Sequence, residues 1–233
     1  MIYPNMTVRI LAIETSTAAC SAALCIGNEV LERYALAPRQ HAALILPMIE
    51  SVLAEADIAV QMLDAISFGR GPGSFTGVRI AASIVQGIAF AAELPVVPVS
   101  TLAALAQGAM RETGEKQVMA ALDARKDEVY WGCFLQKSEK LVLHGSEVVC
   151  PPANVPQPLP GRWIGAGSGW LAYGEHLLQR CGDDVIRVLP DLEPRAADVA
   201  RLALNDFVQG KSVAADAAVP VYLRDNVADA RPD

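Results

Sequence analysis

A strand pattern that occurs twice constrains the fold more than any other feature of this 233-residue chain. Each copy has an apolar run that ends at an acidic residue, a polar turn, and two further strand-like runs. Self-similarity of this kind predicts a duplicated β-β-β unit followed by helices, with chance similarity between two hairpins as the alternative. The first copy comprises 8–13, Glu14, 20–26 and 30–35, and the second comprises 118–122, Asp123, 128–135 and 140–143.

A helix predicted over 40–56 has more apolar surface than one buried face requires. Residues at i, i+3, i+4 and i+7 form a single apolar face, whereas Leu44 and Leu46 lie off it. Pro47 is expected to kink this helix or to mark its first turns. The surplus apolar surface predicts either a second contact within the fold or a site for a partner. The face itself comprises Ile45, Met48, Ile49, Val52, Leu53 and Ala56.

The segment 69–79, Gly-Arg-Gly-Pro-Gly-Ser-Phe-Thr-Gly-Val-Arg, lies between an apolar strand and an alanine-rich helix that ends near residue 92. Its glycines permit backbone conformations that a side chain forbids, and Ser74 or Thr76 can cap the helix. The free N–H groups of such a loop suit an anion, and a tight turn without a ligand is the alternative. The sequence lacks the Gly-Lys-Ser/Thr of a P-loop.

The remaining elements predict an α/β protein with two domains, 1–108 and a smaller one, 109–233. Whether the last helix packs on the first domain stays open. Met1 and Met6 are equivalent candidates for the start, and the last residues are expected to fray. Further strands are predicted at 96–99, at the start of the glycine-rich segment 163–170 and at 185–189, and further helices at 102–110, 171–181 and 194–208.

The composition excludes several classes of protein. Hydrophobic residues make up 52% and charged residues 19%, which argues against disorder. A net charge of −7 with no Lys/Arg cluster makes the chain a poor binder of nucleic acid on its own. The five cysteines form no CxxC pair, so reduced thiols in the cytosol are expected. No signal peptide or membrane span is indicated.

Sequence motifs for common hydrolases and metal sites are missing. There is no HExxH and no GxSxG. The three histidines, His41, His144 and His176, are too widely spaced to suggest a set of metal ligands. His41 is better explained as part of the first helix than as part of a site, and a hydrolase with a serine nucleophile is the weakest alternative because no Ser/His pairing supports it.

Four motifs together resemble one family within the actin/Hsp70/sugar-kinase superfamily. Their order and spacing, from near residue 8 to near residue 227, are similar to those of the TsaB (YeaZ) family. The motifs are Ile-Leu-Ala-Ile-Glu-Thr-Ser-Thr at 10–17, the glycine-rich segment 69–79, Leu-Asp-Ala-Arg-Lys-Asp-Glu-Val-Tyr at 122–130, and Pro-Val-Tyr-Leu-Arg-Asp-Asn at 220–226.

The resemblance implies duplicated β-β-β-α units, with mixed sheets flanked by helices. It also implies a non-catalytic subunit that binds TsaD, in the formation of N6-threonylcarbamoyladenosine at position 37 of tRNAs that decode ANN codons. The resemblance further implies that TsaE joins a larger complex, that the chain alone forms a homodimer through the same surface, and that tRNA is contacted only indirectly. The implied interface lies on the helices 40–56 and 74–92 and includes His41, Leu44, Ile45, Met48, Ile49, Val52, Arg79, Ala82, Ser83 and Gln86.

The chain departs from catalytic relatives of this family at two places. TsaD-like proteins carry a His-x-x-x-His metal motif where this chain has Thr101 and Leu105, and leucine offers a metal no lone pair. Family members commonly have Asp at the first hairpin turn, where this chain has Glu14. The chain alone is expected to need no metal or cofactor, with ATP or ADP expected, if anywhere, at the interface with TsaD. The rival hypothesis is an ATP-binding phosphotransferase or ATPase of the superfamily, with phosphate-facing candidates Glu14, Thr15, Gly71, Gly73, Ser74, Thr76 and Asp123.

Overall fold

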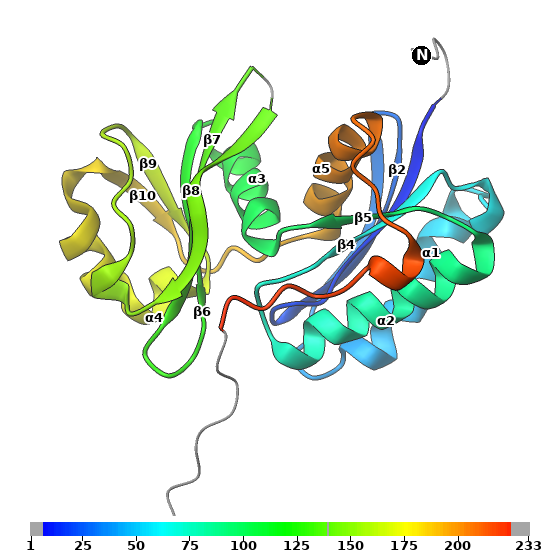
Figure 1. Ribbon diagram of the computed structural model, residues 1–233, viewed down its shortest axis with the longest axis horizontal. Helices are drawn as coiled ribbons and strands as arrows, with labels where there is room; N and C mark the ends of the chain where they lie inside the picture. Colours follow the sequence, from blue (N-terminus) through cyan, green and yellow to red (C-terminus); the bar gives the residue numbers. More distant parts are fainter. Residues whose placement is uncertain (1–6, 139, 225–233) are drawn as a thin grey trace, which may run out of the picture.

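The computed structural model describes residues 7–138 and 140–224, which form two lobes, each built on a five-stranded sheet (Figure 1). The predicted start at Met1 or Met6 and the end of the last motif lie outside these residues. The first lobe contains β1 (Arg9–Glu14), β2 (Ala19–Ile26), β3 (Glu29–Leu36), α1 (His41–Glu55), β4 (Ala65–Gly69), α2 (Phe75–Ala92) and β5 (Val96–Val99). The second contains α3 (Thr101–Thr113), β6 (Gln117–Asp123), β7 (Val129–Lys137), β8 (Lys140–Cys150), β9 (Trp163–Ala166), α4 (Ser168–Cys181) and β10 (Val185–Leu189), and α5 (Ala196–Val208) follows it.

The two sheets have the same topology, so the predicted duplication is confirmed. The first has the order β3-β2-β1-β4-β5, and the second, written from its other edge, has the order β8-β7-β6-β9-β10. In both, the first three strands are antiparallel neighbours and the last two add in parallel. The sheets are therefore mixed and flanked by helices, as the actin/Hsp70/sugar-kinase resemblance predicted.

The helices α3 and α5 each follow the last strand of one sheet and pack on the other sheet. The apolar face of α3 packs on the second sheet, around Leu102 and Leu105, whereas α5 returns to the first sheet and buries Val199 and Ala203 there. The chain thus crosses between the lobes twice. Where the helices meet, both guanidinium nitrogens Nε and Nη2 of Arg111 donate to the buried carboxylate of Asp198, at 3.1 and 3.0 Å. A paired buried charge of this kind fixes one relative position of α3 and α5.

The N-terminus of α5 is tied to the first sheet by side chains of β2 and β3. The backbone N–H of Ala196 donates to Ser21 Oγ at 2.9 Å, and that of Ala197 donates to Glu32 Oε1 at 2.9 Å. Arg195 forms an ion pair with the same glutamate, at 2.6 Å. These contacts satisfy helix N–H groups that would otherwise lack acceptors, so the last helix belongs to the first sheet's core although it lies far from it in sequence.

The helices α1 and α2 cover the other face of the first sheet, and this corrects part of the predicted interface. The side chains of Ile45, Ile49, Val52 and Ala82 are buried in that core. These four residues, which the resemblance placed in the partner interface, therefore lie on the faces that pack on the sheet, because an apolar stripe is driven first against the largest apolar surface within its own chain. Pro47 lies inside α1, which continues through it.

Several elements differ in length from their predicted bounds. The strand β8 runs to Cys150 rather than to residue 143, because its pairing with β7 resumes after an irregularity. Between β8 and β9 the second lobe has a proline-rich stretch, 151–162, instead of a counterpart of α1. Proline lacks the N–H that a helix interior needs. This missing helix makes the second lobe the smaller one.

Only α2, among the residues that the structure describes, is long and apolar enough to meet the length and hydropathy criteria for a membrane span. One face of it packs within the chain, and a third of the helix is buried. Ala81, Val85 and Ala89 are buried against the first sheet, and small side chains let the helix backbone approach the strands closely.

Candidate functional site

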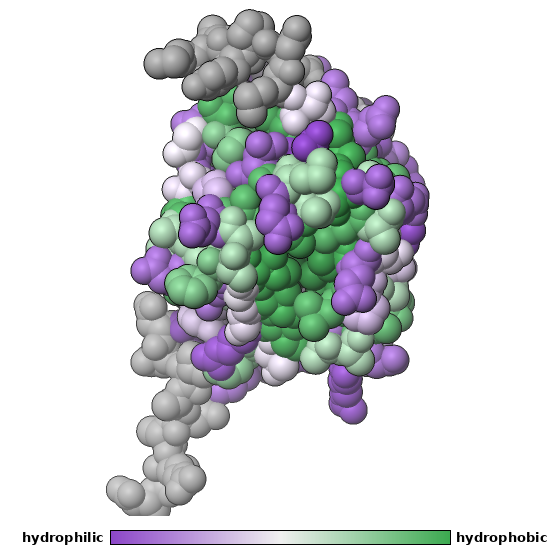
Figure 2. Space-filling model, turned by 90° about the vertical axis from the view of Figure 1, so that its right-hand side faces the viewer, coloured by the Kyte–Doolittle hydropathy of each residue, from purple (hydrophilic) through white to green (hydrophobic). Residues whose placement is uncertain are grey.

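The outer surfaces of α1 and α2 form an exposed apolar patch, which we call the α1–α2 patch. Figure 2 shows apolar side chains gathered at the centre of this side of the molecule. Phe90 on α2 is 82% exposed and Leu46 on α1 is 49% exposed. An extensive apolar area on one face, rimmed by polar residues, marks an interaction site on a soluble protein. The exposed members of the patch are Ala42, Ala43, Leu46 and Pro47 of α1 and Ser83, Gly87, Phe90 and Ala91 of α2.

The structure separates the predicted interface residues into three groups. Arg79 and Ser83 are exposed, and Leu44, Met48 and Gln86 are half-buried. His41 is buried, with its Nε2 3.1 Å from the carbonyl oxygen of Ala19, so it anchors the start of α1 to β2. The remaining four, Ile45, Ile49, Val52 and Ala82, are the core residues described above.

Sequence reasoning missed Phe90, which is the most exposed large apolar side chain of the described residues. It did single out Leu46 as lying off the main face. A signal for Phe90 was available, because it follows Gly87 by three residues and Ser83 by seven, and so continues the exposed stripe of α2 rather than its buried one. Helical spacing alone does not say which of two apolar stripes faces the sheet.

An aromatic cluster begins α2 beside this patch. The guanidinium of Arg79 lies over the ring of Phe75, at 3.3 Å from its centroid, and 5.5 Å from the ring centroid of Tyr222. The two rings are 5.9 Å apart. Gln86 holds the segment around Ala218 against the same helix by donating from Nε2 to the carbonyl oxygen of Ala218. The segment that follows α5 therefore lies along α2 and adds Tyr222 to its surface.

The glycine-rich loop between β4 and α2 closes directly onto the first hairpin turn. The N–H of Ser74 donates to the carbonyl oxygen of Ser16 at 2.7 Å, and Thr15 Oγ1 donates to the carbonyl oxygen of Gly77 at 2.7 Å. A Cβ added at Gly73 would lie 2.5 Å from the Ser16 carbonyl oxygen, and one added at Gly77 would lie 2.0 Å from that of Thr15. These two glycines make room for backbone of the same chain.

Glu14 is enclosed beneath this loop and has no exposed surface. Its Oε1 accepts a hydrogen bond from the N–H of Ser16 at 2.7 Å, and Thr101 Oγ1 donates to its Oε2 at 3.4 Å. A Cβ at Gly69 would lie 1.9 Å from Oε2, so Gly69 leaves space for this carboxyl group. Burial raises the pKa of Glu14 above its usual value, and the hydrogen bonds from Ser16 and Thr101 oppose that shift only partly.

Replacing Glu14 with glutamine should reduce the pH dependence of stability. Because the pKa of Glu14 is raised in the folded state, the stability it contributes is complete below the pKa of the unfolded chain and is lost as pH rises through the folded pKa. Denaturation in urea, measured at about pH 5 and about pH 8, should show a smaller loss of unfolding free energy for Glu14→Gln than for the wild type. Equal losses in the two proteins would contradict this. The glutamine oxygen can still accept from Ser16, which keeps the comparison fair.

The second acidic residue, Asp123, occupies the same turn position but opens onto a cleft between the lobes. Its Oδ1 accepts from the N–H of Arg125 at 2.8 Å, two residues on, as Glu14 accepts from Ser16. Its other oxygen pairs with the Arg125 guanidinium at 3.3 Å. The cleft has a volume of about 930 Å³ and is also lined by Gly73, Ser74 and Thr76. The predicted phosphate-facing residues are thus divided: Glu14, Thr15 and Gly71 are buried, and Gly73, Ser74, Thr76 and Asp123 line the cleft.

Core side chains occupy the two positions at which TsaD-like proteins are expected to carry metal-binding histidines. Thr101 and Leu105 are fully buried, Thr101 Oγ1 lies 3.1 Å from Ser16 Oγ, and Leu105 belongs to the α3 core. Within residues 7–138 and 140–224, no group of three or more His, Cys, Asp or Glu side chains is arranged to hold a metal. All five cysteines are free thiols, and burial raises the pKa of Cys20 to about 11.

Comparison with known proteins identifies close relatives. The family model described as "TsaD: tRNA N6-adenosine threonylcarbamoyltransferase" matches residues 33–231. The chain is 45% identical, over 94% of its length and 96% of the relative, to the tRNA threonylcarbamoyladenosine biosynthesis protein TsaB of Escherichia coli, and 39% identical to the TsaB of Haemophilus influenzae, over 96% and 95%. The solved structure of YeaZ from Pseudomonas aeruginosa aligns with a TM-score of 0.88 and 47% identity, over 93% of this chain and 100% of that one.

Proposed function

The chain belongs to the TsaB (YeaZ) family of tRNA threonylcarbamoyladenosine biosynthesis proteins, and from this membership we propose that it is a non-catalytic subunit that activates a TsaD-type transferase by binding it. The reaction it supports is formation of N6-threonylcarbamoyladenosine at position 37 of tRNAs that decode ANN codons. The observation that carries the proposal is the α1–α2 patch, because an apolar face of this kind on a tRNA-modification protein calls for a protein partner.

The similarity of this chain to the TsaD family supports a pairing between two proteins of related fold. The TsaD family model matches most of this chain, so the two proteins have related folds and each has helices equivalent to α1 and α2. Two such helix pairs packing together bury both apolar faces at once. The same geometry allows a second copy of this chain to occupy the patch when no TsaD-type partner is present.

The non-catalytic part of the proposal is supported by the burial of the residues beneath the glycine-rich loop. Glu14 and Thr15 lie beneath the glycine-rich loop and are hydrogen-bonded within the chain. Thr101 and Leu105 stand where the related transferases are expected to carry metal-binding histidines. The loop therefore serves to start and position α2, and any nucleotide is shared with the partner at the interface.

The remaining partners follow from the same proposal. A TsaE-type ATPase joins the pair in a larger complex, and tRNA is contacted through the other subunits, in agreement with a net charge of −7 on this chain. The site of action is the cytoplasm, where tRNA modification takes place.

Complex formation tests the proposal directly. Purified protein mixed with the TsaD-family protein of the same organism should elute from size-exclusion chromatography as a heterodimer, and depletion of this chain in cells should lower threonylcarbamoyladenosine in tRNA. Failure of the wild-type protein to bind would exclude the subunit role.

The isolated chain should show no saturable binding of magnesium and ATP in calorimetry. The reason is that Ser74 N–H is already bonded to the carbonyl oxygen of Ser16, and the spaces beside Gly73 and Gly77 are filled by backbone. The complex with the TsaD-type partner provides the positive control. Micromolar affinity of the isolated chain for ATP would support the rival hypothesis of a nucleotide-dependent enzyme.

A further inference from the structure

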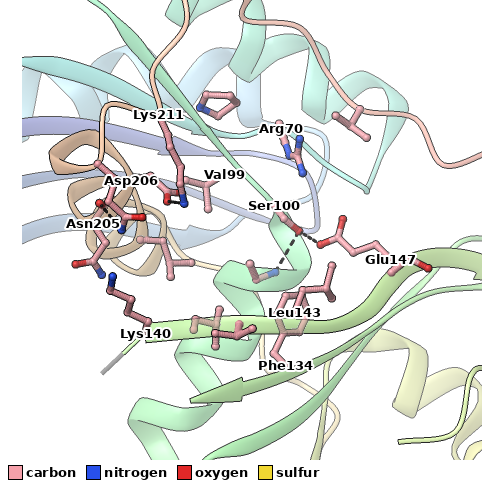
Figure 3. Close-up of a pocket in the computed structure, with 18 of the residues that line it drawn as sticks. Arg70, Val99, Ser100, Phe134, Lys140, Leu143, Glu147, Asn205, Asp206 and Lys211 are labelled. Atoms are coloured by element: carbon pink, nitrogen blue, oxygen red, sulfur yellow. Dashed lines mark hydrogen bonds and ion pairs between the residues drawn. The ribbon is translucent and has the colours of Figure 1, made fainter. Parts of the chain in front are cut away.

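The last described segment of the chain, residues 219–224, crosses the gap between the two lobes, and we call it the strap. Figure 1 shows it running from α2 to the end of β6. Val221 and Leu223 line both the cleft beside Asp123 and a second cavity of about 630 Å³. The strap therefore divides the space between the lobes in two. Figure 3 shows the second cavity, whose walls come from the end of β5, the strand β8 and the end of α5.

Backbone atoms fix the strap to the first lobe. The N–H of Val221 donates to the carbonyl oxygen of Arg70, in the glycine-rich loop, at 2.8 Å. The loop fits closely around this contact, because a Cβ added at Gly71 would lie 2.9 Å from the Val221 carbonyl oxygen. Gly71 also has a positive φ of 100°, which glycine adopts readily. Just before the strap, Gln86 holds the carbonyl oxygen of Ala218 on α2. Substitution of a strap side chain therefore leaves this anchor in place.

A side chain, rather than backbone, holds the strap to the second lobe. Within residues 219–224, the polar contacts with that lobe are those of Arg224. Its Nη2 donates to the carbonyl oxygen of Ala124 at 3.2 Å and forms an ion pair with the carboxylate of Glu128. The turn after Asp123 is closed between the same two residues, because the N–H of Ala124 donates to the carbonyl oxygen of Glu128 at 2.9 Å. Arg224 thus grips both ends of one turn.

The two anchors limit the width of the cleft. Val221 and Arg224 are three residues apart, and three residues of fully extended chain span at most about 11 Å. One anchor is on the glycine-rich loop and the other is on the turn after Asp123, and these segments supply the first-lobe and second-lobe walls of the cleft. While both anchors hold, the walls cannot separate further than the strap and the arginine side chain reach.

The lobes also touch beside the two places where the chain crosses between them. The first crossover is Ser100, between β5 and α3, and its hydroxyl donates to Glu147 on β8 (Figure 3). The second crossover, 190–195, leads into α5, where Asp198 pairs with Arg111 of α3. Short connections between packed bodies are the places at which hinge rotation occurs. Rotation about these two crossovers would open the cleft, and the strap is placed to resist it.

We propose that Arg224 is a releasable latch. While it is bonded to the turn after Asp123, the strap holds the lobes at one separation, and its release lets them rotate about the crossovers and widens the cleft. The asymmetry of the anchors carries this inference, since backbone bonds hold the strap on one lobe and a charged side chain holds it on the other. The latch belongs to the isolated chain, so it does not depend on the proposed partner.

Residual dipolar couplings, measured by NMR on the isotopically labelled full-length chain, test the latch because they report the orientation of each lobe. In the wild type, the couplings of the two sheets should fit one common alignment tensor. In Arg224→Met, which removes every donor of the side chain, the two sheets should require different tensors. Arg162→Met is the matched control. Its ion pair with Glu115, at 3.4 Å, lies within the second lobe, so one tensor should still fit.

Glu128→Ala is a second variant, which removes the partner and leaves the strap unchanged, and it should also require two tensors. Amide exchange at Val221 separates release of the latch from loss of the whole strap. In both variants it should change by less than about threefold, because the bond to Arg70 remains. A common tensor in either variant would overturn the proposal, and so would two tensors in the wild type or a larger rise in exchange at Val221.

Discussion

Replacing Phe90 with glutamate should abolish the association with a TsaD-type partner and leave the fold intact. The side chain is 82% exposed and makes few contacts within its own chain, so its loss costs little stability. In the proposed complex the same position is covered, and a buried unpaired charge is strongly unfavourable. Because aromatic residues at the centre of an interface carry much of its energy, we expect affinity to fall by about a hundredfold or more. Calorimetry or surface plasmon resonance with the purified partner measures it.

Leu171→Glu is the matched control for this experiment. Leu171 is 65% exposed on α4, on the second lobe, and it should tolerate the same substitution without effect on binding. Leu46→Glu, on α1, should reproduce the effect of Phe90→Glu. Binding that survives both patch substitutions, with thermal stability unchanged, would show that the partner uses another face. Ile49 and Ala82 are unsuitable for this purpose, because a charge at either buried position would unfold the chain.

Replacing Gly77 with alanine should destabilise the chain by about 2 kcal/mol or more. Two opposing effects contribute. Alanine is favoured over glycine in a helix by about 1 kcal/mol, but its Cβ would lie 2.0 Å from the carbonyl oxygen of Thr15 and 3.0 Å from the carbonyl carbon. Neither atom can move without separating the first hairpin turn from α2, and the hydrogen bond from Thr15 Oγ1 to Gly77 would then be lost. The steric effect is therefore expected to dominate.

Gly87→Ala provides the comparison within the same helix. An added Cβ at Gly87 meets nothing within 4 Å, so the helix preference acts alone and the variant should be more stable by about 0.5 to 1 kcal/mol. Urea denaturation of the three proteins measures both differences. If Gly77→Ala were as stable as the wild type, the close approach of α2 to the hairpin turn would not be a constraint on this fold.

The strands and the duplication of the lobes could be predicted from the sequence because they depend on local patterns. Apolar runs that end at Glu14 and Asp123 repeat with the same turns and the same third strands, and backbone pairing follows from them. The helix bounds were predicted within a few residues for the same reason. The length of β8 was not, because its second half is half-exposed and carries no alternating pattern that marks its end.

Which apolar face of each helix is buried and which is exposed could not be predicted in this way. Ile49 and Phe90 are both apolar residues on helices with surplus apolar surface, yet one is buried on the sheet and the other is the most exposed large apolar side chain described. Which stripe faces inward depends on where the sheet lies and on how closely small residues such as Ala81 let the helix approach it. That information comes from contacts between segments far apart in the chain.

The sequence by itself thus determined the family, the duplicated architecture and the place of the glycine-rich loop, since these rest on motifs and on short-range periodicity. Only the tertiary structure decided that Glu14 lies beneath that loop and that α5 returns to the first sheet. Burial and pairing of charged groups depend on distances between residues that the order of the chain does not fix. For that reason the candidate sites, unlike the fold, became visible only when the lobes were assembled.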